Sequence, residues 1–255
     1  MNKATVVDFE SKGILPRPYY PPQPVGVSIW FPGKKPEYEA WGHPTENGLF
    51  VMRGEKAIKI AEPSRERAAK KLKDAWKGKL LFHHARFDSD VGYVWFGLPD
   101  LSYDQYGDTM FRLFLKDPHV ATLALKPNSE RFLGMPPEER DEVRQWLVDH
   151  GICAANASDD EFGMNLWRAP GRLVAKYSIG DVLRTKGLDE CKKLALDRRE
   201  QEAYERELRV MPIFLRNERG GLRLDVDRLE HDLILYEWCL DYVEQCCASG
   251  SRLRI

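Results

Sequence analysis

The chain has 255 residues, of which 43% are hydrophobic and 31% are charged. This length predicts one large domain, alone or with a small appendage, and the composition argues against intrinsic disorder as the main state. Lys and Arg number 39 and Asp and Glu 40, so the formal charge of −1 neither requires a nucleic-acid partner nor excludes one. No apolar run approaches the length of a membrane-spanning helix and no secretory signal is visible, so we expect no membrane partner.

The cysteines and histidines form no recognisable metal or disulfide pattern. The five cysteines contain no CxxC spacing, and the six histidines contain no HxxxH or HExxH. We therefore expect reduced thiols in a cytoplasmic protein. If the protein binds a metal ion, we expect carboxylates to be the ligands.

The N-terminal part of the chain predicts three strands. Thr5–Val7 is a short β-branched run, and Val25–Trp30 and Tyr38–Trp41 follow as a second and a third strand. The proline-rich stretch Pro16–Pro24 is typical of a loop. Pro32-Gly33 marks a turn, so the second and third strands should form a hairpin or meander.

Helices and strands then alternate. The pattern predicts a helix from Ser64 to the residue before Gly78, a strand at Leu80–His83, a helix at Asp88–Phe96, a strand at Tyr103–Asp108 and a helix at Thr109–Lys116. From residue 138 onward almost the whole sequence favours helix, ending in two long helices at 202–217 and 226–247. Gly220-Gly221 should end the first of these, and Asp225 should cap the second. The fold class is therefore α/β or α+β, with residues 201–255 as a helical extension.

Two carboxylates stand where the first predicted strand should end. Asp8 and Glu10 are two positions apart, and residues with that spacing on a strand share one face. Their charges would repel each other unless a cation lies between them, and hard oxygen ligands suit Mg²⁺ or Mn²⁺. Most tripeptides of the form D-x-E lie in solvated turns, so this spacing alone does not establish a metal site.

Two further segments place polar side chains on helices. Phe87 would anchor the start of a helix, and Asp88 would lie near its N-terminus, where the helix dipole favours an anion. Tyr177 and Asp181 are four residues apart and hence lie on one helical face. A simple cap would explain Asp88, and a surface pair would explain Tyr177 and Asp181, without any function.

Taken together and in this order, the segments resemble the three motifs of the DEDD 3′–5′ exonucleases. Val6–Ser11 is similar to the first motif, D-x-E, and His83–Asp88 to the second, HN-x-x-FD, with His84 in place of the usual Asn. Tyr177–Asp181 is similar to the third motif, Y-x-x-x-D, of the tyrosine subclass. The resemblance implies a ribonuclease H-like fold, in which helices flank a mixed β-sheet.

Other segments are similar to the proofreading domains of family A DNA polymerases, especially phage ones. They are Asp108–Met110, Leu125–Pro127, Arg131–Gly134 and Asp181–Thr185. Met211–Ile213 and Glu218–Asp225 are similar to the segment that joins such a domain to the polymerase thumb. The resemblance implies an exonuclease domain at residues 1–200 and a linker-like extension at 201–255. Because the sequence ends where a polymerase would begin, we expect no polymerase activity. The chain would be a stand-alone exonuclease, a truncated relative, or part of a longer polymerase of a bacterial or phage-infected cell.

The resemblance also implies a two-metal hydrolysis of phosphodiester bonds, with two Mg²⁺ or Mn²⁺ ions. Asp8 would bridge both ions, Glu10 and Asp181 would help to hold the ion that carries the attacking water, and Asp88 would act through water on the second ion. Tyr177 would orient the attacking water. The expected products are nucleoside 5′-monophosphates, released from single-stranded or frayed 3′ ends of DNA. A polymerase domain or replication proteins are the expected protein partners.

The candidate residues for gripping the DNA end are Ser11, His84 and Phe87. The run from Arg65 to Lys79 carries seven Lys or Arg against two acids, but a solvated helix face is the simpler interpretation of that run. Two alternatives stay open. One is an RNA-directed 3′–5′ exonuclease of the same superfamily, and the other is a relative that binds nucleic acid without hydrolysing it.

Overall fold

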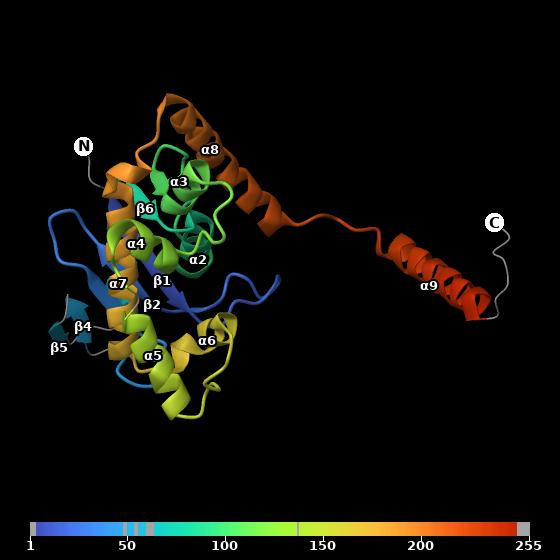
Figure 1. Ribbon diagram of the computed structural model, residues 1–255, viewed down its shortest axis with the longest axis horizontal. Helices are drawn as coiled ribbons and strands as arrows, with labels where there is room; N and C mark the ends of the chain where they lie inside the picture. The colour runs from blue at the N-terminus through green and yellow to red at the C-terminus, as the bar shows by residue number, and fades with distance from the viewer. Residues whose placement is uncertain (1–3, 48–49, 54–55, 60–63, 137, 249–255) are drawn as a thin grey trace. The chain divides into compact units, whose positions relative to one another are not determined.

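The computed structural model describes residues 4–47, 50–53, 56–59, 64–136 and 138–248 (Figure 1). The chain divides into two compact units, Met1–Leu215 and Arg216–Ile255. The first unit contains the β-sheet and the helices that cover it. None of the helices that the structure describes is long and apolar enough to cross a membrane.

The described strands of the first unit form one seven-stranded mixed sheet in the order β5-β4-β3-β2-β1-β6-β7. β1 runs antiparallel to β2 on one side and parallel to β6 on the other, while β2 to β5 form an antiparallel meander. Helices flank this sheet, so the structure confirms the predicted ribonuclease H-like α/β fold. The strands are β1 (Thr5–Ser11), β2 (Pro24–Trp30), β3 (Glu37–Ala40), β4 (Phe50–Arg53), β5 (Lys56–Lys59), β6 (Leu80–Phe82) and β7 (Tyr106–Asp108).

The helices agree with the sequence pattern over most of the chain, and the predicted helix at Thr109–Lys116 has the bounds of α3. The sequence did not predict α4 or the β4–β5 hairpin. The helices are α1 (Ser64–Ala75), α2 (Ala85–Phe96), α3 (Thr109–Lys116), α4 (Leu125–Leu133), α5 (Glu138–Asp149), α6 (Asp159–Asn165), α7 (Gly171–Glu190), α8 (Arg198–Gly220) and α9 (Val226–Ala248), with 3₁₀ turns at Leu166–Arg168 and Lys192–Leu194.

The side chains of β1 alternate between two apolar cores, as strand geometry requires. Val7 and Phe9 point into the core that α1, α2 and α8 cover. Val6 points to the opposite face, where it packs with Trp30, Leu81 and Val182 of α7. Asp8 and Glu10 follow Val6 at intervals of two residues, so both carboxylates face α7.

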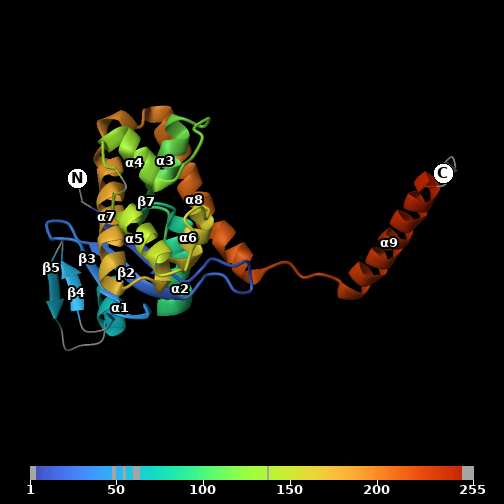
Figure 2. The same cartoon turned by 60° about the horizontal axis from the view of Figure 1, so that its bottom comes forward.

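Helix α7 is the element that faces these carboxylates. It packs along β1, β2 and β3, and α4 and α5 pack against it in turn (Figures 1 and 2). Its buried side chains include Val174, Ser178, Asp181 and Val182, which recur at helical spacing and form one face. A polar and an acidic side chain thus lie on the same face as the apolar ones that fix α7 to the sheet.

Two predicted boundaries differ from the structure. Asp8 and Glu10 do not follow the end of the first strand, because β1 continues through Ser11 as the partner of β2. The compact unit also extends past residue 200 to Leu215. The physical reason is that one face of α8 belongs to the core of the sheet, through Tyr204, Leu208 and Met211.

The second unit contains the last residues of α8 and helix α9. α8 ends at Gly220, and Gly221 follows with a φ of +66° and donates its N–H to the Asn217 carbonyl at 2.8 Å. Such a left-handed residue after a helix favours glycine. The Asp225 carboxylate accepts the Arg228 N–H at 3.1 Å, so it caps α9 as the sequence predicts.

Candidate metal centre

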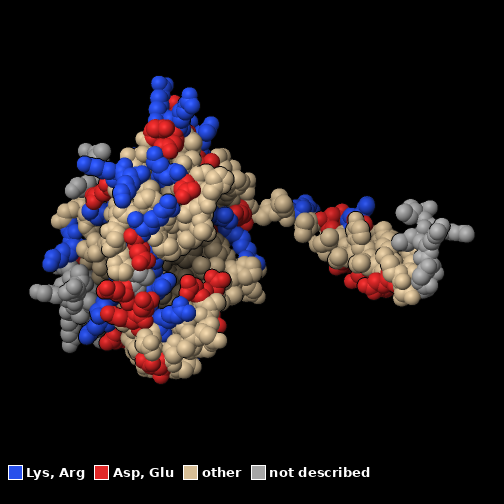
Figure 3. Space-filling model, viewed as in Figure 1, with Lys and Arg blue, Asp and Glu red and all other residues tan. Residues whose placement is uncertain are grey.

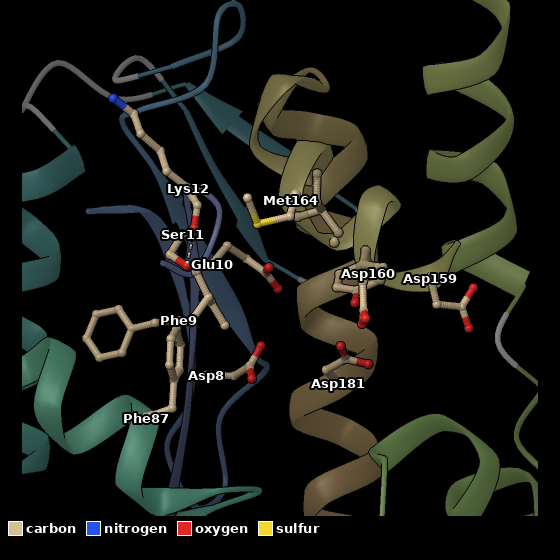
Figure 4. Close-up of a pocket in the computed structure, with 14 residues that line it drawn as sticks. Asp8, Phe9, Glu10, Ser11, Lys12, Phe87, Asp159, Asp160, Met164 and Asp181 are labelled. Carbon is tan, nitrogen blue, oxygen red and sulfur yellow. Dashed lines mark hydrogen bonds between the residues drawn. The ribbon is translucent and has the colours of Figure 1, made fainter. Parts of the chain in front are cut away.

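Three of the predicted carboxylates converge between β1 and α7. Asp8, Glu10 and Asp181 each offer a carboxylate oxygen, and these atoms lie within 4.8 Å of one another. The carboxylates of Asp8 and Glu10 on β1 point across to α7, which carries Asp181 (Figure 4). Residues that are more than 170 positions apart in the sequence thus form one acidic cluster, because α7 packs across β1.

Asp88 lies beside this cluster and is not one of its three converging members. It is buried in the first turn of α2, and its Oδ1 accepts the backbone N–H of Phe9 at 2.9 Å. β6 pairs with β1 only at Thr5 and Val6, so further along that edge of β1 the carboxylate takes the place of a neighbouring strand. Asp88 therefore fixes the backbone between Asp8 and Glu10.

Asp108 fixes α2, the helix that carries Asp88. Its carboxylate accepts the N–H groups of His84 and Ala85 at the start of α2 and the N–H of Met110 in α3. The Tyr204 hydroxyl of α8 accepts the N–H of Asp108 at 2.6 Å and donates to its carbonyl at 3.1 Å. One carboxylate thus caps two helices, and a hydroxyl from α8 holds its backbone.

The electrostatics of the cluster favour protons or cations. Burial, and then the nearby Asp181, raise the pKa of Asp8 to about 7. Burial, and then Asp8, hold the pKa values of both Glu10 and Asp88 well above their usual range. These carboxylates are therefore costly to ionise together unless positive charge compensates them.

Lys126 of α4 supplies part of that charge. Its Nζ donates to the two carboxylate oxygens of Asp181 at 2.7 and 2.5 Å and lies 3.7 Å from the ring centroid of Tyr177. Burial alone would lower the pKa of Lys126, but Asp181 raises it above its ordinary value. Lys126 was not predicted as a site residue, because nothing in the neighbouring sequence marks it as buried.

α7 contributes two more side chains to the site. The Ser178 hydroxyl donates to Asp8 Oδ2 at 3.2 Å. Tyr177 lies one turn before Asp181, and burial raises the pKa of its phenol, so the hydroxyl stays protonated at neutral pH. Arg184, whose side chain is almost completely buried, binds Glu139 and lies 3.6 Å from Asp181.

The cluster opens into a pocket of about 550 Å³. Ser11 and Phe87, two of the predicted substrate-binding residues, line this pocket together with the three carboxylates and Tyr177. His84 does not line it. It precedes α2 with a φ of +77°, a left-handed conformation, and its side chain is exposed. The residues that line the pocket and were not predicted from the sequence include Lys12, Ile14, Asp159, Asp160, Gly163, Met164 and Leu166.

The donor set fits a hard divalent cation. Carboxylate oxygens are the ligands that Mg²⁺ and Mn²⁺ prefer, and three of them converge here without His or Cys. The ammonium group of Lys126 on Asp181 also shows that this position accepts a cation. The residues that could hold the ion are Asp8, Glu10 and Asp181, with Asp88 next to them.

Comparisons with known proteins do not identify the function of this chain. No known family model matches the sequence, and no curated protein is similar to it. One solved structure, described as the apo form of a nuclease, is 19% identical, with a TM-score of 0.46 over 86% of this chain and 85% of the other. A likeness this distant does not transfer an activity, so the function has to be inferred from the side chains of the site.

Proposed function

We propose that the chain is a metal-dependent 3′–5′ exodeoxyribonuclease. The observation that carries this proposal is the convergence of Asp8, Glu10 and Asp181 beside Tyr177 in an open pocket. Carboxylates placed in this way serve phosphoryl-transfer enzymes, because the ions that they bind neutralise charge on the phosphate and activate water. The ordered resemblance of the sequence to the DEDD motifs supports the 3′–5′ direction and the use of two ions.

The chain's own residues have separate tasks in this reaction. Asp8, Glu10 and Asp181 would hold the cations, and Asp88 keeps Asp8 and Glu10 in place through the Phe9 N–H. Tyr177 keeps its proton and can therefore donate a hydrogen bond, which suits a residue that orients the attacking water better than one that removes a proton from it. Mg²⁺ or Mn²⁺, when bound, would lower the pKa of that water and neutralise the developing charge.

The pocket suits an unpaired DNA end. Its volume of about 550 Å³ falls in the range of pockets that enclose a small molecule, so it can admit a nucleotide but not a duplex. Phe87 and Phe9 line the pocket together with the carboxylates. Aromatic rings bind bases by stacking, which tolerates any sequence, so Phe87 is a reasonable contact for the terminal base.

The test compares 3′-labelled and 5′-labelled single-stranded oligonucleotides with Mg²⁺, with Mn²⁺ and with a chelator. We expect a ladder from the 5′-labelled strand, immediate release of labelled mononucleotide from the 3′-labelled strand, and no reaction with chelator. A blocked 3′ terminus should stop the reaction. An RNA strand of the same sequence, measured in parallel, decides between DNA and RNA as the substrate.

Two variants of α7 serve as a matched pair. Asp181→Asn should be inactive. Asp189→Asn changes another carboxylate of the same helix, one that pairs with Arg112 of α3, and should keep the activity of the unmodified chain. Equal activity of both variants would contradict the proposed site. Cutting of a closed circular single strand by the pure protein would contradict the exonuclease assignment.

A further inference from the structure

Helix α9 carries an apolar seam with heptad spacing. Large apolar side chains occur at intervals of three and four residues along one side of the helix. They are Val226, Leu229, Leu233, Tyr236, Leu240 and Val243. This alternation of three and four places them at the a and d positions of three successive heptads, which is the signature of a helix that pairs with another helix.

None of the residues that the structure describes in its own unit buries this seam. No residue of α9 is buried, and Leu233 and Leu240 are 51% and 60% exposed. In Figure 3 most of α9 is uncharged surface, with acidic atoms near its start and along its lower edge. Apolar surface of this extent on one helix marks a site of interaction, because its exposure to water is unfavourable.

Acidic residues flank the seam on both sides. The e positions are Glu230, Glu237 and Glu244, and the g positions of the first heptads are Asp225 and Asp232. The whole helix, Val226–Ala248, carries six carboxylates against one arginine. In coiled coils the charges at e and g select the partner.

These charges oppose pairing of α9 with a second copy of itself. In a parallel pair each g residue faces an e residue of the partner, so Asp232 would meet Glu237 of the other copy. In an antiparallel pair the row of glutamates would face the same row. The parallel arrangement places like charges side by side in the first two heptads, and the antiparallel arrangement does so along the glutamate row, which disfavours a homodimer.

We propose that α9 forms a coiled coil with a helix of another protein that carries lysine or arginine at its e and g positions. The partner's apolar a and d residues would pack into the seam, and its basic residues would pair with the two acidic rows. The acidic residues at e and g favour a partner with basic residues at these positions. The same acidic residues disfavour a second copy of this chain. The three site carboxylates lie in the first unit, so the pairing uses none of the residues of the proposed metal site.

Two synthetic peptides test the proposal against the full chain. Both have the 23-residue length of α9, with Ile at a and Leu at d, and they differ only at e and g, which are all Lys in one peptide and all Glu in the other. We expect the Lys peptide to bind at least about tenfold more tightly than the Glu peptide, and the difference to shrink in high salt. Fluorescence anisotropy of labelled peptides measures both affinities.

Variants of α9 locate the binding face. Leu233→Asp and Leu240→Asp should weaken binding of the Lys peptide at least about tenfold, whereas Leu235→Asp, the same change outside the seam, should leave it within about twofold. Reversing the glutamate row with Glu230→Lys, Glu237→Lys and Glu244→Lys should transfer the preference to the Glu peptide. Circular dichroism checks that each variant stays helical, and nuclease activity should not change.

Three results would overturn the proposal. The first is equal affinity for the two peptides, which would mean that the seam binds any apolar helix. The second is no binding of either peptide by a chain whose α9 is helical. The third is a dimer in sedimentation experiments that Leu240→Asp dissociates, because a second copy would then cover the seam despite its charges.

Discussion

The sheet carries two groups of buried carboxylates that differ in how well they are compensated. Glu39 of β3 is only 1% exposed, and both Arg67 and Lys71 of α1 bind it. The charge of Glu39 is therefore compensated by two cationic side chains of the chain itself, without a bound ligand. These contacts also explain two of the basic residues in the run from Arg65 to Lys79, whose charges hold α1 against β3.

The cluster of Asp8, Glu10 and Asp181 lacks such compensation. Among the described residues its direct cation is Lys126, which binds Asp181, with Arg184 further away at 3.6 Å. Asp8 and Glu10 accordingly have raised pKa values. The difference indicates that the Glu39 group contributes to stability, whereas the cluster of Asp8, Glu10 and Asp181 could accept positive charge from a bound cation.

The largest difference between the two groups should appear in activity. Asp8→Asn should reduce the nuclease rate by about 10³-fold or more, because cation binding contributes several kcal/mol to the transition state and each 1.4 kcal/mol is worth tenfold. Glu39→Gln makes the same chemical change in the compensated group and should keep a near-normal rate below its unfolding temperature. Single-turnover kinetics measure both variants, and a rate for Asp8→Asn near that of the unmodified chain would remove Asp8 from the site.

The same pair of variants should behave in the opposite way in unfolding experiments with chelator. Glu39→Gln should lose stability toward the lower end of the roughly 3–5 kcal/mol typical of a broken buried ion pair, because Lys71 can still bind Glu37. Asp8→Asn should keep or gain stability, because it removes one of several repelling charges. Urea unfolding measures both free energies, and equal losses would refute the distinction between the two groups.

Lys126→Met tests the partial compensation directly. The metal-free protein at pH 8 should lose stability, by less than the roughly 3–5 kcal/mol of a broken buried pair, because Arg184 remains near Asp181. Mn²⁺ should then raise the melting temperature more in the variant than in the unmodified chain. If Mn²⁺ stabilises both proteins equally, Lys126 does not share its position with the cation.

Stability in chelator should also depend on pH. The folded-state pKa of Asp8 is raised from 3.8 to about 7, so between these values the folded chain binds more protons than the unfolded chain. The free energy of unfolding should therefore fall as pH rises from about 4 to 7, by at most about 1.4 kcal/mol per pH unit for each such carboxyl. Asp8→Asn should flatten this decline, and urea titrations at several pH values will show whether it does.

Tyr177→Phe should have the smallest effect. In the proposed reaction its hydroxyl would orient a water that the cation would activate, so we expect a rate loss near or below the lower end of the 10²–10⁴-fold typical of acid–base and positioning groups. Oligonucleotide affinity measured in Ca²⁺ should not change. A variant with unchanged rate and unchanged affinity would reduce Tyr177 to a packing residue under Lys126.

Local patterns predicted most of the fold. β2 and α3 have clear periodicity and clear end signals, and the structure places them where the sequence does. α4 was missed because it is short and polar and contains Pro127, which is tolerated only because it lies in the first turn. The β4–β5 hairpin was also missed, and its strands are only four residues long.

The carboxylates of the site could be predicted, but their compensation could not. Asp8 and Glu10 share a face because of their spacing, and the resemblance to known motifs added Asp88 and Asp181. The position of Lys126 depends on an ion pair with a residue 55 positions away, which arises only when α4 packs on α7. Such non-local pairs leave no local pattern in the sequence.

The contact between Tyr204 and Asp108 has a consequence for sequence variation and for where the chain can be shortened. The hydroxyl of Tyr204 both accepts from and donates to the Asp108 backbone, while the Asp108 carboxylate caps the helix that bears Asp88. A chain that ends at residue 200 would keep every predicted site residue and yet lose this support. In homologous sequences we therefore expect positions 108 and 204 to change together, with an aromatic hydroxyl present wherever an aspartate caps both helices.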